Sequence, residues 1–153
     1  AVSPELLVCD ESIAALDVSI QAQVLNLFVK LKQDYDLTYL FISHDIGVIE
    51  HISDRVIVMY LGRIVETAPI EAFVKQPNHP YTKALLEGVP RLEIGHRDYE
   101  PVIGEIPSPL DPPTGCHFHP RCKHSSERCK AVRPALVEIA PDHFSACHLN
   151  HSE

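Results

Sequence analysis

The sequence lacks several features that would each identify a broad class of protein. No apolar run is long enough to cross a bilayer as a helix, and the opening Ala-Val-Ser-Pro does not resemble a signal peptide. An excess of positive charge is also absent, because 13 Lys and Arg residues stand against 21 Asp and Glu, a net charge of −8. This acidity argues against nucleic acid as a main partner and against electrostatic adhesion to anionic lipid. Any association with a membrane would therefore depend on another protein.

Internal repeats and low-complexity tracts are absent as well, but the composition changes partway along the chain. The length of 153 residues suggests about one domain, and the 45% hydrophobic content is ample for a core. From residue 93 onward the chain carries eight of its 13 prolines and seven of its 10 histidines, and apolar periodicity largely disappears. Such a segment forms only a small hydrophobic core of its own and usually needs a further stabilising element, such as disulfides or a bound metal. We therefore predict an α/β part over residues 1–92 and an irregular extension over residues 93–153, with a boundary near residues 90–95.

Two adjacent acids follow an apolar run near the start of the chain. The run Leu6-Leu-Val-Cys is typical of a strand buried on both faces, as in parallel sheets, and it ends at Asp10 and Glu11. Because an unpaired buried charge is costly, such acids favour a ligand site at the carboxyl end of the strand. There Asp10 can hold Mg²⁺, and Glu11 can orient or deprotonate a water beside a phosphate. The alternative is a surface turn with two solvated acids.

A second apolar run supplies a histidine at the equivalent place. Residues 38–43 are predicted to form a strand that is followed by His44, and two neighbouring strands would put Glu11 and His44 on the same rim of the sheet. Between the two strands, Asp17 opens a long amphipathic helix. The alternatives are that His44 merely begins a helix without binding a ligand, and that Asp17 is a plain helix cap. The apolar stripe of the helix comprises Ile20, Val24, Leu27, Phe28 and Leu31.

Further elements are predicted as far as residue 87. The long helix should end around residues 34–36, and Gly62 lies in a tight turn between two strand-like runs, which indicates a hairpin. The predicted hairpin strands cover residues 54–60 and 63–67, and short helices are expected over residues 46–52, 70–75 and 81–87.

These motifs together resemble a known family. Three motifs resemble, in order, the Walker B, D-loop and switch-histidine series of ABC-transporter ATPases. They are Leu-Leu-Val-Cys-Asp10-Glu11, Ala-Leu-Asp17 and Phe-Ile-Ser-His44-Asp. Two further stretches resemble the oligopeptide/dipeptide importer branch of this family, which also includes nickel importers. They are residues 15–27 and the segment His79-Pro-Tyr-Thr-Lys-Ala-Leu-Leu. The resemblance covers nearly the whole chain and implies a partial P-loop NTPase core of α/β class.

The resemblance implies roles for four residues and implies ATP and Mg²⁺ as cofactors. Glu11 would polarise the attacking water, His44 would contact the γ-phosphate, Asp10 would contact Mg²⁺, and Asp17 would cross to a second ATPase subunit. The chain departs from the family pattern at Ser12, where proline is usual, and at Ala14, where serine is common. Ser12 keeps a turn-compatible residue but loosens the backbone, so we expect weakened precision rather than lost function.

The glycine-rich phosphate loop, the signature loop and the glutamine loop of this family do not occur in the sequence. We therefore expect this chain to be the C-terminal part of a longer protein and to be inactive in ATP hydrolysis by itself. The full-length protein would energise import of peptides or related solutes such as nickel complexes.

The resemblance also implies partners and a location. A second ATPase subunit, identical or different, would pair with the protein on two membrane permeases, at the cytoplasmic face of the inner or plasma membrane. A solute-binding protein on the other side would deliver the substrate, and nucleic acid is not expected to bind. Two alternatives are a soluble ABC ATPase that acts on ribosomes or DNA, and a metal-binding regulatory module without ATPase activity.

Four of the five cysteines gather near the end of the chain. Cys116, Cys122, Cys129 and Cys147 have the spacing C-x5-C-x6-C-x17-C. In a cytosolic protein such a cluster favours metal binding over disulfides, and four thiolates suit zinc or a [4Fe–4S] cluster. The pattern is not two CxxC pairs, which weakens a zinc ribbon, and the resemblance to the importer extension implies the iron–sulfur cluster. Free or oxidised thiols are the third possibility. For zinc, further candidate ligands are His117, His119, His124, His143 and His148.

Overall fold

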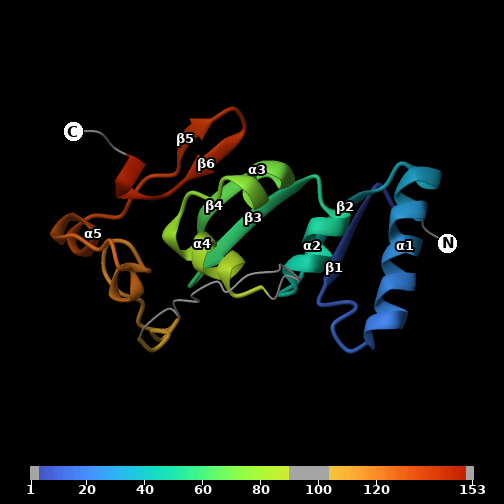
Figure 1. Ribbon diagram of the computed structural model, residues 1–153, viewed down its shortest axis with the longest axis horizontal. Coiled ribbons are helices and arrows are strands. Elements are labelled where there is room, and N and C mark those ends of the chain that lie inside the picture. The colour runs from blue at the N-terminus through green and yellow to red at the C-terminus, as the bar shows by residue number, and fades with distance from the viewer. Residues whose placement is uncertain (1–3, 90–103, 151–153) are drawn as a thin grey trace, which may run out of the picture. The chain divides into compact units, whose positions relative to one another are not determined.

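The computed structural model describes residues 4–89 and 104–150 (Figure 1). The chain divides into two compact units, unit 1 with residues 1–54 and unit 2 with residues 55–153. The domain boundary predicted near residues 90–95 lies outside the described residues. No helix among the described residues is long and apolar enough to cross a membrane.

Unit 1 is a βαβ arrangement that ends in a second helix. Strand β1 (Leu6–Asp10) pairs in parallel with β2 (Thr38–Ile42), and the register runs from Leu6 opposite Thr38 to Asp10 opposite Ile42. Helix α1 (Val18–Tyr35) is the crossover that two parallel strands require, and α2 (Ile46–Ile52) follows β2. The parallel register brings the carboxyl ends of both strands to the same edge, as predicted.

Local sequence signals set both ends of α1. The Asp17 carboxylate oxygen Oδ1 accepts hydrogen bonds from the N–H groups of Ser19 and Ile20 at 3.1 and 3.0 Å. These bonds satisfy two of the backbone donors that a helix start leaves open. At the other end Asp36 adopts a left-handed conformation with φ of 53°, which terminates the helix. The predicted start and end of this helix are confirmed.

The core of unit 1 lies on one side of its small sheet. It comprises Ile13, Leu25, Val48 and Ile52, with Val24, Phe28, Val29 and Phe41 packed against it.

The opposite face of the sheet is open, because helices of unit 1 cover only one side. Leu6 and Val8 are 55% and 60% exposed, and Leu40 and Ile42 of β2 are also exposed. The prediction that the first strand is buried on both faces is therefore wrong for the described residues. A fully buried strand needs a layer over each face, and its apolar run alone does not supply the second layer.

Unit 2 is built on a four-stranded antiparallel sheet in the order β3-β4-β6-β5. Strands β3 (Arg55–Tyr60) and β4 (Arg63–Pro69) form the predicted hairpin. The turn residues Leu61 and Gly62 both have positive φ, as a tight two-residue hairpin requires. The short strands β5 (Val137–Ala140) and β6 (His143–Ser145) add to β4, where Glu66 is opposite Ser145. Strands β5 and β6 thus complete a sheet whose first strand, β3, lies about eighty residues earlier in the sequence.

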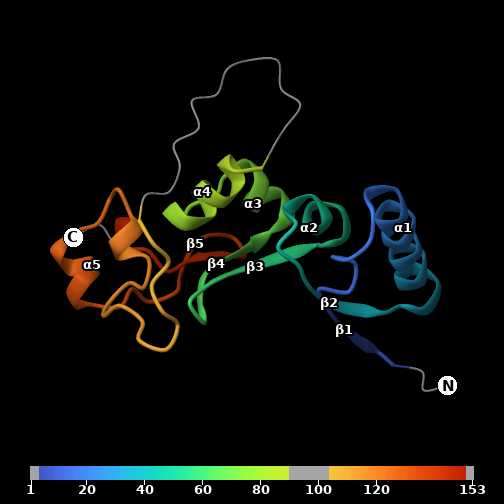
Figure 2. The same ribbon diagram turned by 90° about the horizontal axis from the view of Figure 1, so that it is seen from below.

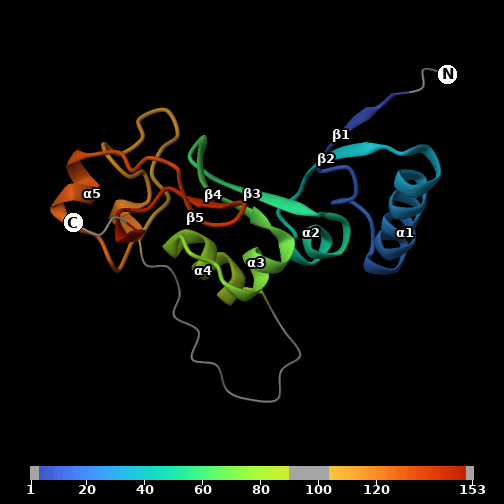
Figure 3. The same cartoon turned by 90° about the horizontal axis from the view of Figure 1, so that it is seen from above.

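Short helices and 3-10 turns make up the rest of unit 2. Helices α3 (Ile70–Lys75) and α4 (Pro80–Glu87) lie on one face of the hairpin, as Figures 2 and 3 show. The predicted helices at both places are confirmed. The later part of unit 2 contains the 3-10 turns η1 (His119–Arg121) and η2 (His148–Asn150) and the single-turn helix α5 (Glu127–Ala131).

An aromatic cluster ties the cysteine-containing loop to the hairpin. Phe118, which is 2% exposed, packs its ring 5.3 Å from the ring centre of Tyr60 on β3 and 5.4 Å from that of Tyr81 on α4. Tyr60 and Tyr81 are themselves 4.7 Å apart. Burying three such rings together stabilises the loop beyond what its few short elements provide.

Candidate functional sites

The carboxyl ends of β1 and β2 bring together two side chains that the sequence singles out. His44 Nδ1 lies 3.0 Å from each carboxylate oxygen of Glu11. The His44 side chain is 78% exposed and that of Glu11 is 44% exposed, so an external ligand can reach both. The predicted placement of Glu11 and His44 on one rim of the sheet is confirmed, whereas their catalytic roles stay predictions.

The backbone at Glu11 has an uncommon conformation. Its φ of 50° lies in the left-handed region, which a residue other than glycine occupies at a cost of about 1–3 kcal/mol. The Glu11 N–H donates to the Ile42 carbonyl at 3.0 Å, which continues the parallel ladder one residue beyond β1. The ladder bond holds the backbone in place at the residue whose carboxylate meets His44.

The pair is also coupled electrostatically. The pKa of His44 is raised, first by its hydrogen bond to Glu11 and then by the negative charge of that carboxylate, with a smaller contribution from Asp45. Asp45 in turn caps α2, since its Oδ1 accepts from the N–H groups of Gly47 and Val48 at 2.9 and 3.3 Å. The cap fixes the turn that carries His44. The arrangement therefore favours the protonated form of the His44 imidazole.

The two other predicted rim residues are placed differently. Asp10 is the last residue of β1 and is exposed, next to Glu11 in sequence. Asp17 uses Oδ1 to cap α1, which is the structural role that the sequence also allowed. A contact of Asp17 with a second subunit stays a prediction.

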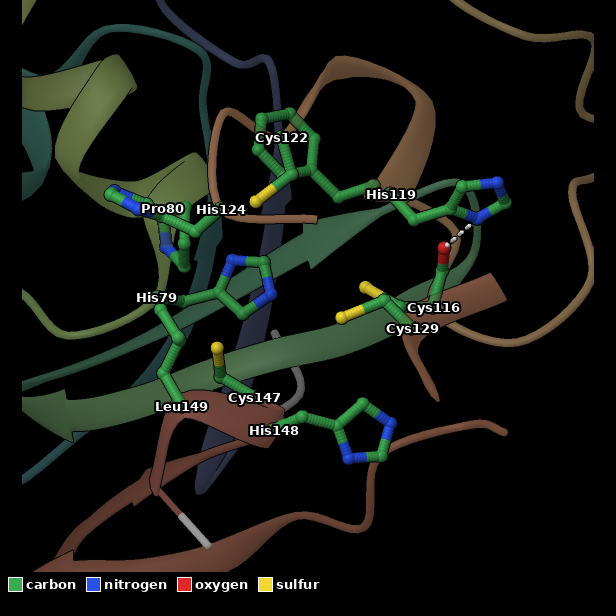
Figure 4. Close-up of a pocket in the computed structure, with 11 residues that line it drawn as sticks. His79, Pro80, Cys116, His119, Cys122, His124, Cys129, Cys147, His148 and Leu149 are labelled. Atoms are coloured by element: carbon green, nitrogen blue, oxygen red, sulfur yellow. Dashed lines mark hydrogen bonds between the residues drawn. The ribbon is translucent and has the colours of Figure 1, made fainter. Parts of the chain in front are cut away.

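In unit 2, the four clustered cysteines line one small cavity, which we call the cysteine pocket (Figure 4). Its volume is about 20 Å³, room for roughly one water-sized sphere. The sulfur atoms of Cys116, Cys122, Cys129 and Cys147 point toward this shared space. Cys116 and Cys122 flank η1, Cys129 lies in α5, and Cys147 directly precedes η2. The four cysteines that the sequence predicts as metal ligands thus line one cavity and form no disulfide among the described residues, and their role as ligands stays a prediction.

Burial governs the acidity of these thiols. It raises the pKa of Cys116, Cys122 and Cys147, and in each case a backbone N–H two residues further along opposes the rise by donating to the sulfur. The sulfur of Cys129 lies 3.3 Å from the Ser126 hydroxyl oxygen. The three backbone donors belong to Phe118, His124 and Leu149.

The packing of the cysteine loop depends on a glycine. Gly115 has a φ of 64°, and a Cβ built on it would lie 2.3 Å from the Cys129 carbonyl oxygen. The adjacent Cys116 N–H donates to that same carbonyl at 2.8 Å. Only a residue without a side chain fits where the two loops meet, so Gly115 determines how closely Cys116 approaches Cys129.

A formed metal cage is not present in residues 4–89 and 104–150, where no three His, Cys, Asp or Glu side chains are close enough together to hold an ion. Three of the candidate zinc ligands place a ring nitrogen on backbone carbonyls instead. His117, His119 and His148 contact the carbonyls of Leu61, Cys116 and Val132 at 3.3, 2.9 and 2.8 Å. Metal binding by the cysteines therefore stays a prediction.

The sequence analysis missed a buried acid in unit 2. Glu66 on β4 is fully buried, and its carboxylate accepts from the N–H groups of Asn78 and His79 at 2.9 and 2.7 Å. Its Oε1 also lies 2.7 Å from His143 Nε2 on β6. A carboxylate with three partners fixes the entry to α4 and ties it to two strands. The only signal in the sequence was one acid inside an apolar strand.

His79, in the segment whose sequence resembles the importer branch, has a structural role. It caps α4, because its Nδ1 accepts from the Tyr81 N–H at 3.1 Å, and Pro80 follows at the first helical position. Burial lowers the pKa of His79 to about 4, although the negative charge of Glu66 acts in the opposite direction. The ring is therefore neutral at neutral pH.

Residues 65–129 match the family model described as oligopeptide/dipeptide transporter, C-terminal region. The chain is 48% identical to the probable peptide ABC transporter ATP-binding protein y4tS of Sinorhizobium fredii over 97% of its length, which covers 42% of that relative. It is 51% identical to the oligopeptide transport ATP-binding protein AppF of Bacillus subtilis, over 96% of the chain and 46% of the relative. The dipeptide transport ATP-binding protein DppF of Haemophilus influenzae is 48% identical over 94% of the chain and 44% of the relative. The chain spans less than half of the length of these relatives.

Proposed function

We propose that the chain, which is homologous to the C-terminal region of oligopeptide and dipeptide ABC-transporter ATP-binding proteins, supplies the water-activating side of an ATP hydrolysis site that drives peptide import. The observation that carries this proposal is the contact between Glu11 and His44 at the ends of two parallel strands. Both groups are exposed on the rim where an α/β sheet binds its ligands.

The chemistry follows from what each side chain can do. The Glu11 carboxylate accepts a hydrogen bond from the attacking water and takes up its proton as the bond to phosphorus forms. The His44 Nδ1–H donates a hydrogen bond to Glu11 and keeps its proton, which holds the carboxylate in one orientation and leaves the Nε2 side of the ring free to donate to a phosphate oxygen. The two residues therefore act as one positioned unit.

Asp10 completes the rim. A Mg²⁺ ion, when bound, would neutralise charge on the phosphate oxygens, and the exposed carboxylate of Asp10 is the group that would hold it, directly or through water. Asp17 is proposed to face a second ATPase subunit with the parts of its side chain that do not cap α1. Within such a pair, the protein would act on two permeases at the cytoplasmic side of the membrane.

For the cysteine pocket we propose an iron–sulfur cluster, with zinc as the alternative. Tetrahedral zinc at about 2.3 Å from each sulfur needs four thiolates packed around one point. The described residues form no such cage, and four cysteine thiolates would suit either a [4Fe–4S] cluster or zinc, so the cluster is proposed on the resemblance to the importer extension. The backbone N–H groups that already face three sulfurs fit either metal, because they stabilise thiolates. When bound, the cluster would link the loops and could exchange an electron.

Single-turnover ATP hydrolysis by the full-length protein tests the proposed function. Glu11→Gln should still bind ATP but hydrolyse it ~10²–10⁴-fold more slowly, because the amide accepts no proton. Glu71→Gln is the matched control, since Glu71 is an exposed acid that pairs with Lys75 within its own helix, and it should leave the rate unchanged. Undiminished hydrolysis by Glu11→Gln would overturn the proposal.

A further inference from the structure

The ring of His44 lies against Glu11 although packing leaves its orientation largely open. The side chain is 78% exposed, and exposed side chains ordinarily change rotamer within nanoseconds. The 3.0 Å contacts between His44 Nδ1 and the Glu11 carboxylate therefore depend on where the backbone places the two residues. Whatever fixes the backbone at His44 thus decides how well the pair is formed.

The hydroxyl of Ser43 closes a turn around His44. Ser43 Oγ accepts a hydrogen bond from the Asp45 N–H at 3.0 Å, which is a side-chain bond to the second residue along the chain. The ring of atoms that this bond closes contains the whole backbone of His44. The φ and ψ angles of His44 can therefore change little while the bond is kept.

Both ends of this turn are attached to ordered parts of unit 1. On one side Asp45 caps α2, whose buried side chains belong to the core of the unit. On the other side Ile42, directly before Ser43, accepts the backbone N–H of Glu11 at 3.0 Å. Ser43 therefore lies between the residue that holds the Glu11 backbone and the histidine that contacts the Glu11 carboxylate.

We propose that Ser43 is a positioning residue for ATP hydrolysis, whose hydroxyl holds the His44 backbone so that the imidazole stays against Glu11. This inference rests on the function proposed above for the Glu11–His44 pair. The pKa of His44 is raised, first by its hydrogen bond to Glu11, as a maintained contact between the two side chains requires. Because a displacement of about 1 Å can slow a reaction ~10²-fold, a hydroxyl behind the pair can affect the rate without touching the reacting atoms.

Two substitutions and one control isolate this hydroxyl. Ser43→Ala removes the acceptor, whereas Ser43→Thr keeps it and should behave like the wild type. Ser108→Ala is the matched control, because the Ser108 hydroxyl accepts the Leu110 N–H at 3.2 Å, the same kind of bond in unit 2. Ser43 is only partly buried, so the urea denaturation midpoint of Ser43→Ala should stay close to that of the wild type.

The first measurement is an NMR titration of His44 in the full-length protein without nucleotide. If the Ser43 hydroxyl holds the ring against Glu11, the pKa of His44 should fall toward 6.5 in Ser43→Ala. It should remain raised in Ser43→Thr and in Ser108→Ala. A His44 pKa that is as high in Ser43→Ala as in the wild type would overturn the proposal.

The second measurement is single-turnover ATP hydrolysis by the full-length protein. Ser43→Ala should be about tenfold slower, Ser43→Thr should restore the rate, and Ser43→Ala should cause no further loss in a His44→Ala background. An equal loss with and without the His44 ring would show that the hydroxyl does not act through it. If Glu11→Gln hydrolyses ATP at the wild-type rate, the proposed function fails, and the His44 titration still decides whether Ser43 holds the ring.

Discussion

The rim of unit 1 and the interior of unit 2 around Glu66 and His79 place their ionisable groups in opposite surroundings. Glu11 and His44 are exposed and have each other as partners. Glu66 and His79 are almost completely buried, and the hydrogen bonds around them come from the protein itself. Exposed groups remain available to a ligand, while buried groups are committed to holding the fold. Changes at the rim should therefore affect activity without affecting stability, and changes around Glu66 and His79 should first affect stability.

The largest difference between the two units should come from their carboxylates. Glu66→Ala would leave two backbone N–H groups and the His143 ring without their buried acceptor, at a cost of about 3–5 kcal/mol in the free energy of unfolding. Glu11→Ala removes an exposed acid and should change that free energy by less than about 0.5 kcal/mol. Urea denaturation of the two variants checks this, and equal losses would contradict the contrast.

The pH dependence of unit 2 should be next in size. The pKa of His79 is about 4 in the folded protein and 6.5 when unfolded, so the unfolded state binds the proton first as pH falls. Stability is then complete above pH 6.5 and is lost toward pH 4, by about 3 kcal/mol at 1.36 kcal/mol per pKa unit. Amide hydrogen exchange of unit 2 in the metal-free protein should show this loss.

His79→Asn is the control for the pH effect. The variant has no imidazole, so protection of unit 2 amides should decline less between pH 6.5 and pH 4 than in the wild type. Exchange in unit 1 over the same range should not respond to the substitution. An identical decline in variant and wild type would assign the pH dependence to another group.

Two glycines with positive φ provide a smaller comparison. Gly115→Ala would drive a Cβ to 2.3 Å from the Cys129 carbonyl, whereas Gly62→Ala has nothing within 4 Å and meets only backbone strain. We expect about 1 kcal/mol of destabilisation for Gly62→Ala and roughly 2–4 kcal/mol for Gly115→Ala. Thermal unfolding of both variants measures the difference. Similar losses would mean that the two loops near Cys116 separate easily.

The smallest expected effect is at the exposed pair. The pKa of His44 is raised by Glu11, so the pair stabilises the fold below the unfolded pKa of 6.5, and this contribution fades as pH rises through the higher folded pKa. An NMR titration should place the His44 pKa above 6.5 and return it toward 6.5 in Glu11→Gln. A His44 pKa that Glu11→Gln leaves unchanged would show that the two side chains are not coupled in solution.

Much of the fold was predictable as far as Glu87, because each element there has a strong local signal. The strand runs, the Asp17 cap and the glycine at Gly62 correspond to elements that the structure contains. Strands β5 and β6 were not predicted, since four and three residues are too few for an alternating pattern to stand out. Their existence depends on pairing with β4, a long-range contact that local sequence does not encode.

The candidate sites show the same difference between features with a local sequence signal and features that depend on long-range contacts. The Glu11–His44 contact followed from two strand ends that parallel pairing brings together. The convergence of the cysteines was predicted from their number, but the role of Glu66 was not, because its three partners come from places far apart in the sequence. The open face at Leu6 and Val8 was also mispredicted, since an apolar run does not reveal how many layers cover it.

The central claim is that Glu11 and His44 form one water-activating unit, and a double-mutant cycle on ATP hydrolysis by the full-length protein tests it most directly. If the residues act together, Glu11→Gln combined with His44→Ala should be about as slow as Glu11→Gln alone. Rate losses that multiply, as for two independent residues, would contradict the claim.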